Sequence, residues 1–407
     1  MSGSLAKQLA RHLDSLILGP PSFDNLGDLP NMVVYPLFPS SLPPDPPEIL
    51  TLSEGLRYGV RLSDAGQVNK AHVDNPLSTT VLAGESDLLI GATQLRAMQL
   101  SCLIRPHSRA SLPVSCVEEG RPTERQAEFD RSDSSPWSLR SYKMAQMAHH
   151  GEPIQLKVWK KVSSYLERAG ATSNTKSIHA VYEHFSSELD NLSCLFPRTP
   201  GQVGAICAVG SNLYGEFFSD PELLEDRYDQ FLRSALVEAL VHPGDEVVTQ
   251  DRIANFLKEI VDVSVNSKVV HSSGLQNSGR TLVFNGRGIS GSALVDDRRL
   301  IHLCAHMKCP GQGSPFADQL DELQQHCASW KTHNASLLVK LQKECATRRK
   351  SYNIFKARLP STPPPQIQDG PLESYGEIDA DKTHSALPPR PLNTFLHDFF
   401  LNLFRGS

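Results

Sequence analysis

The segment that decides the fold runs from residue 72 to residue 119 and reads HVDNPLSTTVLAGESDLLIGATQLRAMQLSCLIRPHSRASLPVSCVEE. Short apolar stretches rich in β-branched residues alternate in it with turn-forming stretches at 74–76 and 106–108. This alternation is typical of consecutive antiparallel strands joined by tight turns. We therefore predict a sandwich-like antiparallel sheet in this part of the chain.

Strand and helix patterns extend outward from this segment in both directions. Upstream, VVYPLF (33–38) predicts a strand, and Thr51 to Glu54 predicts the start of a helix. Downstream, we predict helices at 138–149, 154–169, 175–190, 220–241 and 250–262, a hairpin around Ser211–Asn212, and closing strands with a tight turn near Asp296–Asp297. The body at 28–310 is thus expected to be an α+β domain of antiparallel β-sandwich-like sheets with several packed helices.

A long C-terminal helix is predicted over 314–357, with Ser314 as its cap and Pro315 in its first turn. Nine of its residues recur at steps of three or four: Phe316, Leu320, Leu323, Cys327, Trp330, Asn334, Leu337, Leu341 and Cys345. Such a heptad seam is typical of a coiled-coil dimer or of a helix that packs along its own domain. A break near 331–334 would instead divide it into a helical hairpin.

Prolines mark the domain boundaries. Nine lie in 20–47 and eight in 360–391, out of 29 in the whole chain. Proline-rich stretches favour extended, solvated backbone, so we interpret both as linkers, with ordered loops as the alternative for the first. The first separates the body from an amphipathic helix at 1–19, which has Leu5, Leu9 and Leu13 on one face. The second separates the body from a final segment at 392–407.

That final segment contains four phenylalanines in the ten residues 395–404. Their side chains would lie on one face of an amphipathic helix, where burial of each is worth about 1.5–3 kcal/mol. The helix at 394–404 is therefore expected to dock on its own body, in the groove of a partner protein, or on a membrane surface.

Composition excludes several classes of function. The chain has 407 residues with a net charge of −5, whereas nonspecific nucleic-acid binders carry a strong basic excess. We find no apolar run long enough for a transmembrane helix, no signal peptide, and eight cysteines without framework spacing. A cytoplasmic protein with reduced thiols is expected, without nucleic acid as a partner.

The first polar candidates lie in AGESDLLIGATQLRAM (83–98). Glu85 precedes the strand-like part, and Gln94 and Arg96 are two residues apart, so they would share one face of a strand. An amide beside a guanidinium suits an anionic or amide-bearing ligand. A solvated outer face of the strand is the alternative.

The second candidates lie in PVSCVEEGR (113–121). Glu118 or Glu119 beside Arg121 is suited to act as a general base, to accept a hydrogen bond from a ribose hydroxyl, or to form an ion pair at the rim of the sheet. Cys116 is expected to be a buried cysteine in preference to a nucleophile.

A third cluster is HLCAHMKC (302–309), where His302, Cys304 and His306 would share one strand face. These are residue types that bind zinc, but the spacing matches no common zinc signature. We predict a partly buried strand end, and neither a metal nor a cofactor. Nucleotide-binding and zinc-protease motifs such as GxxxxGK[ST], GxGxxG after a strand and HExxH are not found in the sequence.

The order of the blocks resembles the ARG and Rhodanese-Phosphatase-superfamily-associated Protein domain family over about 30–306. The resemblance is carried by VVYPLF, TLSEGL, VDNPLSTTVLAGESDLLIGATQLR, SLPVSCVEEGR, SPWSLR, LKVWKKV, PGQVGAICAVGSNLYGEFF and GISGSALVDDRRLIHL. The family takes its name from association with ADP-ribosylglycohydrolases and rhodanese–phosphatase proteins, which implies a place in NAD and ADP-ribose metabolism. This chain departs from the family pattern at Ser86, Asp87 and Leu95.

Three functions are consistent with these observations. The leading expectation is a ligand-binding or regulatory domain in which Glu85, Gln94, Arg96 and Arg121 bind an ADP-ribose-like small molecule. The first alternative is a hydrolase of an ADP-ribose-related substrate with Glu118 or Glu119 as general base. The second is an oligomeric scaffold, a dimer built on the 315–356 heptads.

Overall fold

The computed structural model divides the chain into two units, Met1–Pro364 and Pro365–Ser407. It describes residues 2–21, 29–42, 45–46, 48–120, 128–150, 154–242, 244, 246–265, 268–270, 279–297, 299–311 and 313–360. The second unit, and with it the helix predicted at 392–407, lies outside the described residues, as does nearly all of the predicted linker at 360–391. The fold described below is that of the first unit.

The larger part of this unit is built on an antiparallel sheet. Within the described residues it has eight strands in the order β1-β2-β13-β14-β19-β18-β17-β16. Their bounds are Leu16–Leu18, Met32–Pro39, Gly204–Val209, Asn212–Phe218, Arg299–Lys308, Ile289–Asp296, Arg280–Gly286 and Lys268–Val270. The predicted hairpin at 211–212 joins β13 to β14, and the predicted turn at 296–297 joins β18 to β19.

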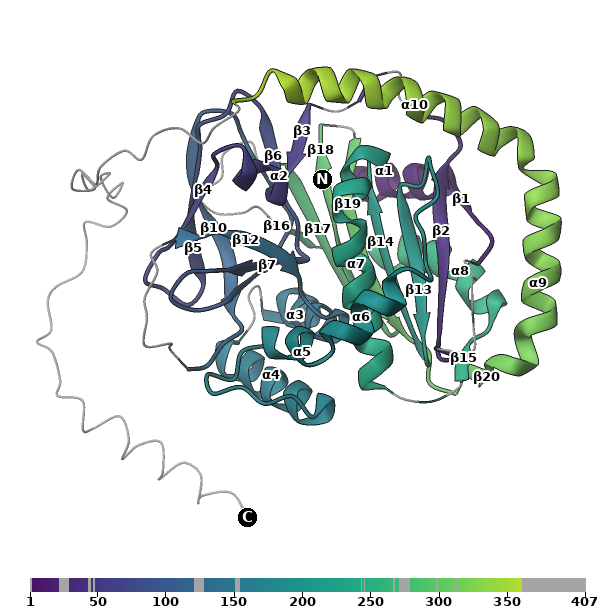
Figure 1. Ribbon diagram of the computed structural model, residues 1–407, viewed down its shortest axis with the longest axis horizontal. Coiled ribbons are helices and arrows are strands. Elements are labelled where there is room, and N and C mark those ends of the chain that lie inside the picture. Colours follow the sequence, from purple (N-terminus) through teal and green to yellow (C-terminus); the bar gives the residue numbers. More distant parts are fainter. Residues whose placement is uncertain are drawn as a thin grey trace, which may run out of the picture. The chain divides into compact units, whose positions relative to one another are not determined.

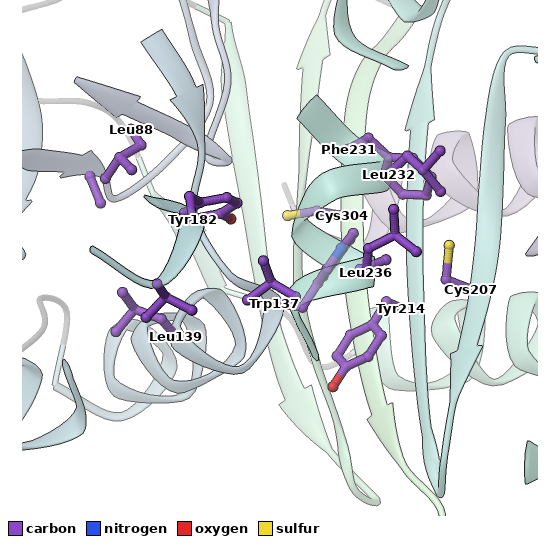
Figure 2. Close-up of a cluster of buried hydrophobic side chains, with 14 of the residues drawn as sticks. Leu88, Trp137, Leu139, Tyr182, Cys207, Tyr214, Phe231, Leu232, Leu236 and Cys304 are labelled. Atoms are coloured by element: carbon purple, nitrogen blue, oxygen red, sulfur yellow. The ribbon is translucent and has the colours of Figure 1, made fainter. Parts of the chain in front are cut away.

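Helices cover both faces of this sheet because side chains alternate along each strand. Val33, Tyr35 and Leu37 of β2 pack with α1 (Ser2–Asp14) and α8 (Gln250–Ser264), while Met32 and Val34 pack with α7 (Pro221–Val241). α3 (Trp137–His150) lies on the same side as α7 and contacts β17 and β18 (Figure 1). The Trp137 ring lies 5.2 Å from that of Tyr214 and 6.0 Å from that of Phe231 (Figure 2).

The segment from 48 to 134 forms a second, smaller β-structure. One sheet has the order β11-β4-β5-β10-β8-β7-β12, and the other β3-β6-β9. In chain order the bounds from β3 to β12 are Ile49–Thr51, Arg61–Asp64, Lys70–Asn75, Thr80–Ala83, Asp87–Ile90, Arg96–Met98, Cys102–Ile104, Ser108–Cys116, Glu128–Phe129 and Arg131–Ser134. The two sheets share one apolar core, which confirms the α+β, sandwich-like prediction, although β3 pairs with β6 in parallel.

The predicted helix start at Thr51 is confirmed. α2 (Leu52–Arg57) begins with a capping box, in which the Thr51 side chain accepts from the Glu54 amide and the Glu54 side chain accepts from the Thr51 amide. After α3, the next helices along the chain are α4 (Gln155–Ala169), α5 (His179–His184) and α6 (Ser186–Ser193). The single helix predicted at 175–190 is therefore wrong, because Ser177 forms a bridge with Glu118, which follows β10, and Phe185 separates α5 from α6.

The first proline-rich stretch is not a linker throughout. Its residues 32–39 form β2, which is hydrogen-bonded between β1 and β13. The N-terminal helix is therefore attached to the body, and Leu5, Leu9 and Leu13 are buried against the large sheet as the predicted apolar face. The helix ends at Asp14, and Leu16 and Ile17 lie in β1.

The predicted long helix is divided at Asn334 into α9 (Phe316–His333) and α10 (Ala335–Ala357), which run along the periphery of the unit (Figure 1). Ser314 does not cap α9: it lies in β20 (Gly313–Pro315), which pairs with β15 (Glu246–Val248). Residues of the heptad seam pack against the body, and Trp330 stacks on Phe38 with ring centroids 5.8 Å apart. The seam is thus occupied by its own chain, which removes the basis for the predicted scaffold dimer. Among the described residues, no helix is long and apolar enough to cross a membrane.

Candidate functional site

The residues predicted around Glu118 do come together. Gln94 Nε2 donates to the carbonyl oxygens of Glu118 at 3.0 Å and Gly120 at 3.1 Å. The Leu95 amide donates to Glu118 Oε2 at 2.9 Å, and Thr175 Oγ1 donates to Glu118 Oε1. Both oxygens of this buried carboxylate are therefore engaged within the protein, and Glu118 holds the loop that follows it.

The side chain of Arg96 is buried next to Gln94. Its Nη2 contacts Asp64 Oδ2 at 3.1 Å, and its Nη1 donates to Gln94 Oε1 at 3.5 Å. The side chain is 3% exposed. Arg96 and Gln94 thus form a chain of contacts that ends at Glu118 and positions residues 118–120. Arg121, the fourth residue predicted to bind ligand, lies outside the described residues.

A turn at 173–177 packs against residues 118–120. The Ser177 amide donates to Ser173 Oγ at 2.9 Å, and Glu118 and Ser177 form an isolated antiparallel bridge. The Gly120 amide donates to the Thr175 carbonyl at 2.8 Å. A Cβ atom at Gly120 would lie 2.8 Å from Thr175 Cα, so this approach requires glycine.

The two paired segments present Glu119 and Lys176 side by side at the surface. Lys176 Nζ lies 2.5 Å from Glu119 Oε2, with 54% and 41% of the two side chains exposed. Both line a cavity of about 370 Å³ next to α4, which we call the α4 pocket. Its lining consists of Glu119, Leu156, Trp159, Lys160, Ser163, Ser164, Glu167 and Lys176.

Helical periodicity explains why α4 supplies most of this lining. The pocket residues at 156, 159, 160, 163, 164 and 167 recur at steps of three and four, so they lie on one face. Val158, Val162 and Tyr165 lie on the opposite face and are buried in the core. Gln155 fixes the start of the helix to β10, since its Nε2 donates to the Cys116 carbonyl at 2.6 Å and its Oε1 accepts from the Cys116 amide at 3.1 Å.

Sequence reasoning missed Trp159, Lys160 and Lys176. The amphipathic pattern of LKVWKKV (156–162) carried a signal for the first two, because an indole and a lysine share its polar face. Lys176 gave no such signal, since tertiary contacts such as the bridge between Ser177 and Glu118 bring the turn at 173–177 to this site.

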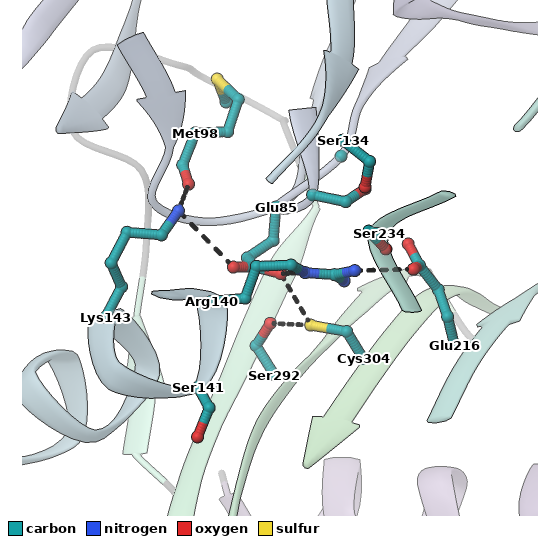
Figure 3. Close-up of polar contacts among 12 residues, drawn as sticks. Glu85, Met98, Ser134, Arg140, Ser141, Lys143, Glu216, Ser234, Ser292 and Cys304 are labelled. Atoms are coloured by element: carbon teal, nitrogen blue, oxygen red, sulfur yellow. Dashed lines mark hydrogen bonds and ion pairs between the residues drawn. The ribbon is translucent and has the colours of Figure 1, made fainter. Parts of the chain in front are cut away.

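Glu85 lies elsewhere, in a buried charge network between the two β-structures. Arg140 Nε contacts Glu85 Oε2 at 2.9 Å, and Arg140 Nη1 contacts Glu216 Oε2 at 2.9 Å (Figure 3). Lys143 Nζ donates to the Met98 carbonyl at 2.5 Å and lies 3.6 Å from Glu85 Oε1. The structure does not bring Glu85 together with Glu118, and the network joins α3 to both β-structures.

The predicted strand face at 302–306 completes this network. His302 Nε2 lies 2.9 Å from Glu216 Oε1, and its Nδ1 lies 2.7 Å from Ser101 Oγ. Cys304 Sγ donates to Glu85 Oε2 at 3.2 Å. The burial predicted for this strand end is confirmed, since His302 and Cys304 are buried. Among the described residues, no group of three His, Cys, Asp or Glu side chains is arranged to hold a metal ion.

Burial and charge act in opposite directions within the network. Burial disfavours the Glu216 carboxylate, but Arg140 and His302 outweigh it and hold its pKa well below the ordinary value. Burial lowers the pKa of Lys143 and raises that of the Cys304 thiol. Because the charged side chains of this network are buried and contact one another, we assign the network a structural role.

Comparison with solved structures finds only remote similarity. An inactive mutant of the CurK dehydratase is 11% identical, with 65% of this chain and 99% of that chain covered and a TM-score of 0.12. The dehydratase domain from the CurK module of curacin polyketide synthase is 12% identical, with 65% and 99% covered and a TM-score of 0.12. Similarity at this level supports no conclusion about the fold or the function of this chain. No curated protein matches the chain.

A family comparison covers most of the first unit. The model of the ARG and Rhodanese-Phosphatase-superfamily-associated Protein domain matches residues 22–306, which is more than half of the chain. The matched range includes the smaller β-structure, most of the large sheet, the buried network and the whole α4 pocket. The chain therefore belongs to the ARG and Rhodanese-Phosphatase-superfamily-associated Protein domain family.

Proposed function

We propose that this protein is a ligand-binding module that takes a nucleotide-like small molecule of the ADP-ribose class in the α4 pocket. The observation that carries the proposal is the lining of the pocket, which combines one indole, two lysines and two serine hydroxyls. We place this function in NAD and ADP-ribose metabolism in the cytoplasm, where the eight free cysteines would remain reduced.

The size of the pocket supports a ligand of this class. Small-molecule sites typically enclose about 300–1,000 Å³, and the α4 pocket encloses about 370 Å³. This volume suits the mononucleotide half of ADP-ribose, with the remainder of the ligand outside.

The chemistry of the lining supports both parts of such a ligand. A purine ring can stack on Trp159, since stacking of a base on an aromatic side chain is worth about 1–3 kcal/mol. Lys160 and Lys176 can bind phosphate oxygens, and Ser163 and Ser164 can donate hydrogen bonds to them. Gln94, Arg96 and Glu118 act as positioning residues behind this surface and do not contact the ligand.

A hydrolase acting on the same class of molecule is the second candidate. Glu119 favours it, because this exposed carboxylate lines the pocket. Glu118 is unsuited to the role of general base, since both of its oxygens already accept hydrogen bonds.

Calorimetric titration of the full chain with ADP-ribose tests the proposal. We expect saturable binding, with about tenfold weaker binding by Trp159→Ala, the loss of a stacking contact of about 1–3 kcal/mol. Lys157→Ala is the matched control, because Lys157 is an exposed lysine of the same helix that does not line the pocket. Absence of binding by the wild-type protein at millimolar ADP-ribose, AMP and NAD would overturn the proposal.

The hydrolase candidate has a separate test. Incubation of the wild-type protein with ADP-ribose or an ADP-ribosylated peptide, followed by chromatography, would reveal turnover. Loss of that turnover in Glu119→Gln with binding retained would favour the hydrolase over the simple binding module. Unchanged turnover in Glu119→Gln would remove Glu119 from the mechanism.

A further inference from the structure

Lys176 has a backbone conformation that residues other than glycine rarely adopt. Its φ angle is 52°, in the left-handed region, where a Cβ atom is disfavoured. Three other described residues with a side chain share this feature, and they lie in the turns that connect consecutive strands: His107, Arg287 and Asp297. Lys176 differs from them because it lines the α4 pocket.

The ammonium group of Lys176 already has a carboxylate beside it. Glu119 Oε2 lies 2.5 Å from Lys176 Nζ at the wall of the pocket. Both side chains are about half exposed, so the pair is weak, and another anion can take the place of the Glu119 carboxylate beside Lys176 without leaving a buried, unpaired charge. The four charged residues of the lining, Glu119, Glu167, Lys160 and Lys176, sum to zero formal charge.

Glu119 cannot leave the pocket by a small movement of its backbone. Its neighbour Glu118 is held by the Leu95 amide and by Thr175, and its other neighbour Gly120 is hydrogen-bonded to the Thr175 carbonyl. The carboxylate is therefore kept within reach of Lys176 as a built-in anion.

We propose that Lys176 is the phosphate-contacting residue of the α4 pocket and that Glu119 competes with the ligand for it. This inference rests on the proposed function and specifies how the site selects its ligand. Binding exchanges the Glu119 carboxylate for a phosphate oxygen on Lys176, while Lys160 contacts the same group from the other side. The pyrophosphate of ADP-ribose as a whole carries more negative charge than the single Glu119 carboxylate and wins this exchange, whereas a ligand with one carboxylate or a neutral nucleoside does not.

Glu119→Gln isolates the competition. The amide keeps the shape of the side chain but releases Lys176, so ADP-ribose should bind about fivefold more tightly, in line with the worth of an exposed ion pair. Adenosine, which has no phosphate, should bind Glu119→Gln and the wild-type protein with the same affinity.

Lys176→Gly isolates the second half of the inference. Glycine adopts the left-handed conformation without strain, so the melting temperature should equal or exceed that of the wild-type protein. Binding of ADP-ribose should nevertheless weaken about tenfold. Arg287→Gly is the matched control, because it relieves the same backbone strain at an exposed turn outside the pocket and should leave binding unchanged.

The results separate the two proposals. If the wild-type protein binds ADP-ribose and Trp159→Ala weakens it, but Glu119→Gln binds no more tightly, the competition is wrong and the binding site stands. Unchanged affinity of Lys176→Gly likewise overturns the role of Lys176 alone. Absence of binding by the wild-type protein overturns both proposals.

Discussion

Arg140 and Glu216 form an ion pair at 2.9 Å, with 2% and 1% of their side chains exposed. The same guanidinium contacts Glu85 and lies 3.7 Å from the centre of the Trp137 ring. One side chain of α3 thus pairs with a carboxylate from each β-structure. Burial of these three charges is costly, and removal of any one of them leaves the others without a partner.

Arg140→Met should therefore destabilise the protein strongly. It leaves Glu85 and Glu216 as buried carboxylates without their guanidinium, a change that typically costs about 3–5 kcal/mol. Urea unfolding followed by tryptophan fluorescence would measure the loss. Arg109→Met is the control, because Arg109 pairs with Asp74 at an exposed site and should cost less than about 1 kcal/mol. Equal losses for the two variants would contradict the structural role of the network.

The fold was largely predictable because its signals are local. The strands between 72 and 119, the hairpin at 211–212 and the helix start at Thr51 each follow from spacing within a few residues. The failures have a tertiary cause. The strand predicted at 33–38 forms as β2, but the surrounding stretch at 20–47 is not a linker throughout, because β2 is hydrogen-bonded between β1 and β13. The helix predicted from 175 begins only at His179 because Ser177 pairs with Glu118.

The candidate site was predictable only in part, for the same reason. Gln94, Arg96 and Glu118 are polar residues whose sequence pattern indicated that they would meet, although only Arg96 lies within a strand, with Gln94 before β8 and Glu118 after β10. Whether they face a ligand or each other depends on Asp64 and Thr175, which are distant in sequence. Glu85 sits in the same polar stretch as Gln94, but it lies at the turn before β7 and points to Arg140 instead.

The free energy of unfolding should depend on pH through His306. Burial lowers its folded-state pKa to about 4 from an ordinary value of 6.5. The unfolded state therefore takes up a proton first, so stability is lost as pH falls from about 6.5 towards 4, by up to about 3 kcal/mol. Unfolding at pH 7.5, 6.0 and 5.0 would show a smaller decline in His306→Gln than in the wild-type protein.

The control for this prediction is His326→Gln. His326 lies on α9, so its replacement removes an imidazole from another part of the unit and shows what a His→Gln change alone does to the curves. Parallel curves for His306→Gln and the wild-type protein would show that His306 does not set the dependence.

Arg348 attaches α10 to the start of α7. Its Nη2 lies 2.6 Å from Asp220 Oδ1 and 2.9 Å from Glu222 Oε2, and its side chain is buried. Arg348→Ala should leave two carboxylates without this partner, cost about 2–4 kcal/mol and expose α10 to proteolysis. Limited trypsin digestion followed by mass spectrometry would map the new cuts.

The neighbouring arginine provides the comparison. Arg349 is 66% exposed and pairs with Glu225 at the surface, so Arg349→Ala should change stability by less than about 1 kcal/mol. Digestion patterns that are identical for Arg348→Ala and the wild-type protein would indicate that apolar contacts alone hold α10 in place.

Gly120 connects the fold to the proposed site. A Cβ atom there would lie 2.8 Å from Thr175 Cα and 3.2 Å from the Thr175 carbonyl oxygen, and backbone atoms cannot yield cheaply. Gly120→Ala should push the turn at 173–177 away from Glu119, cost about 1–3 kcal/mol and weaken ADP-ribose binding by displacing Lys176. Gly286→Ala is the matched control, because its added Cβ would lie 3.6 Å from Val263 Cγ1, an ordinary contact. Since the pocket depends on the close approach of these two segments, a Gly120→Ala protein that binds as tightly as the Gly286→Ala protein would mean that Lys176 does not contact the ligand.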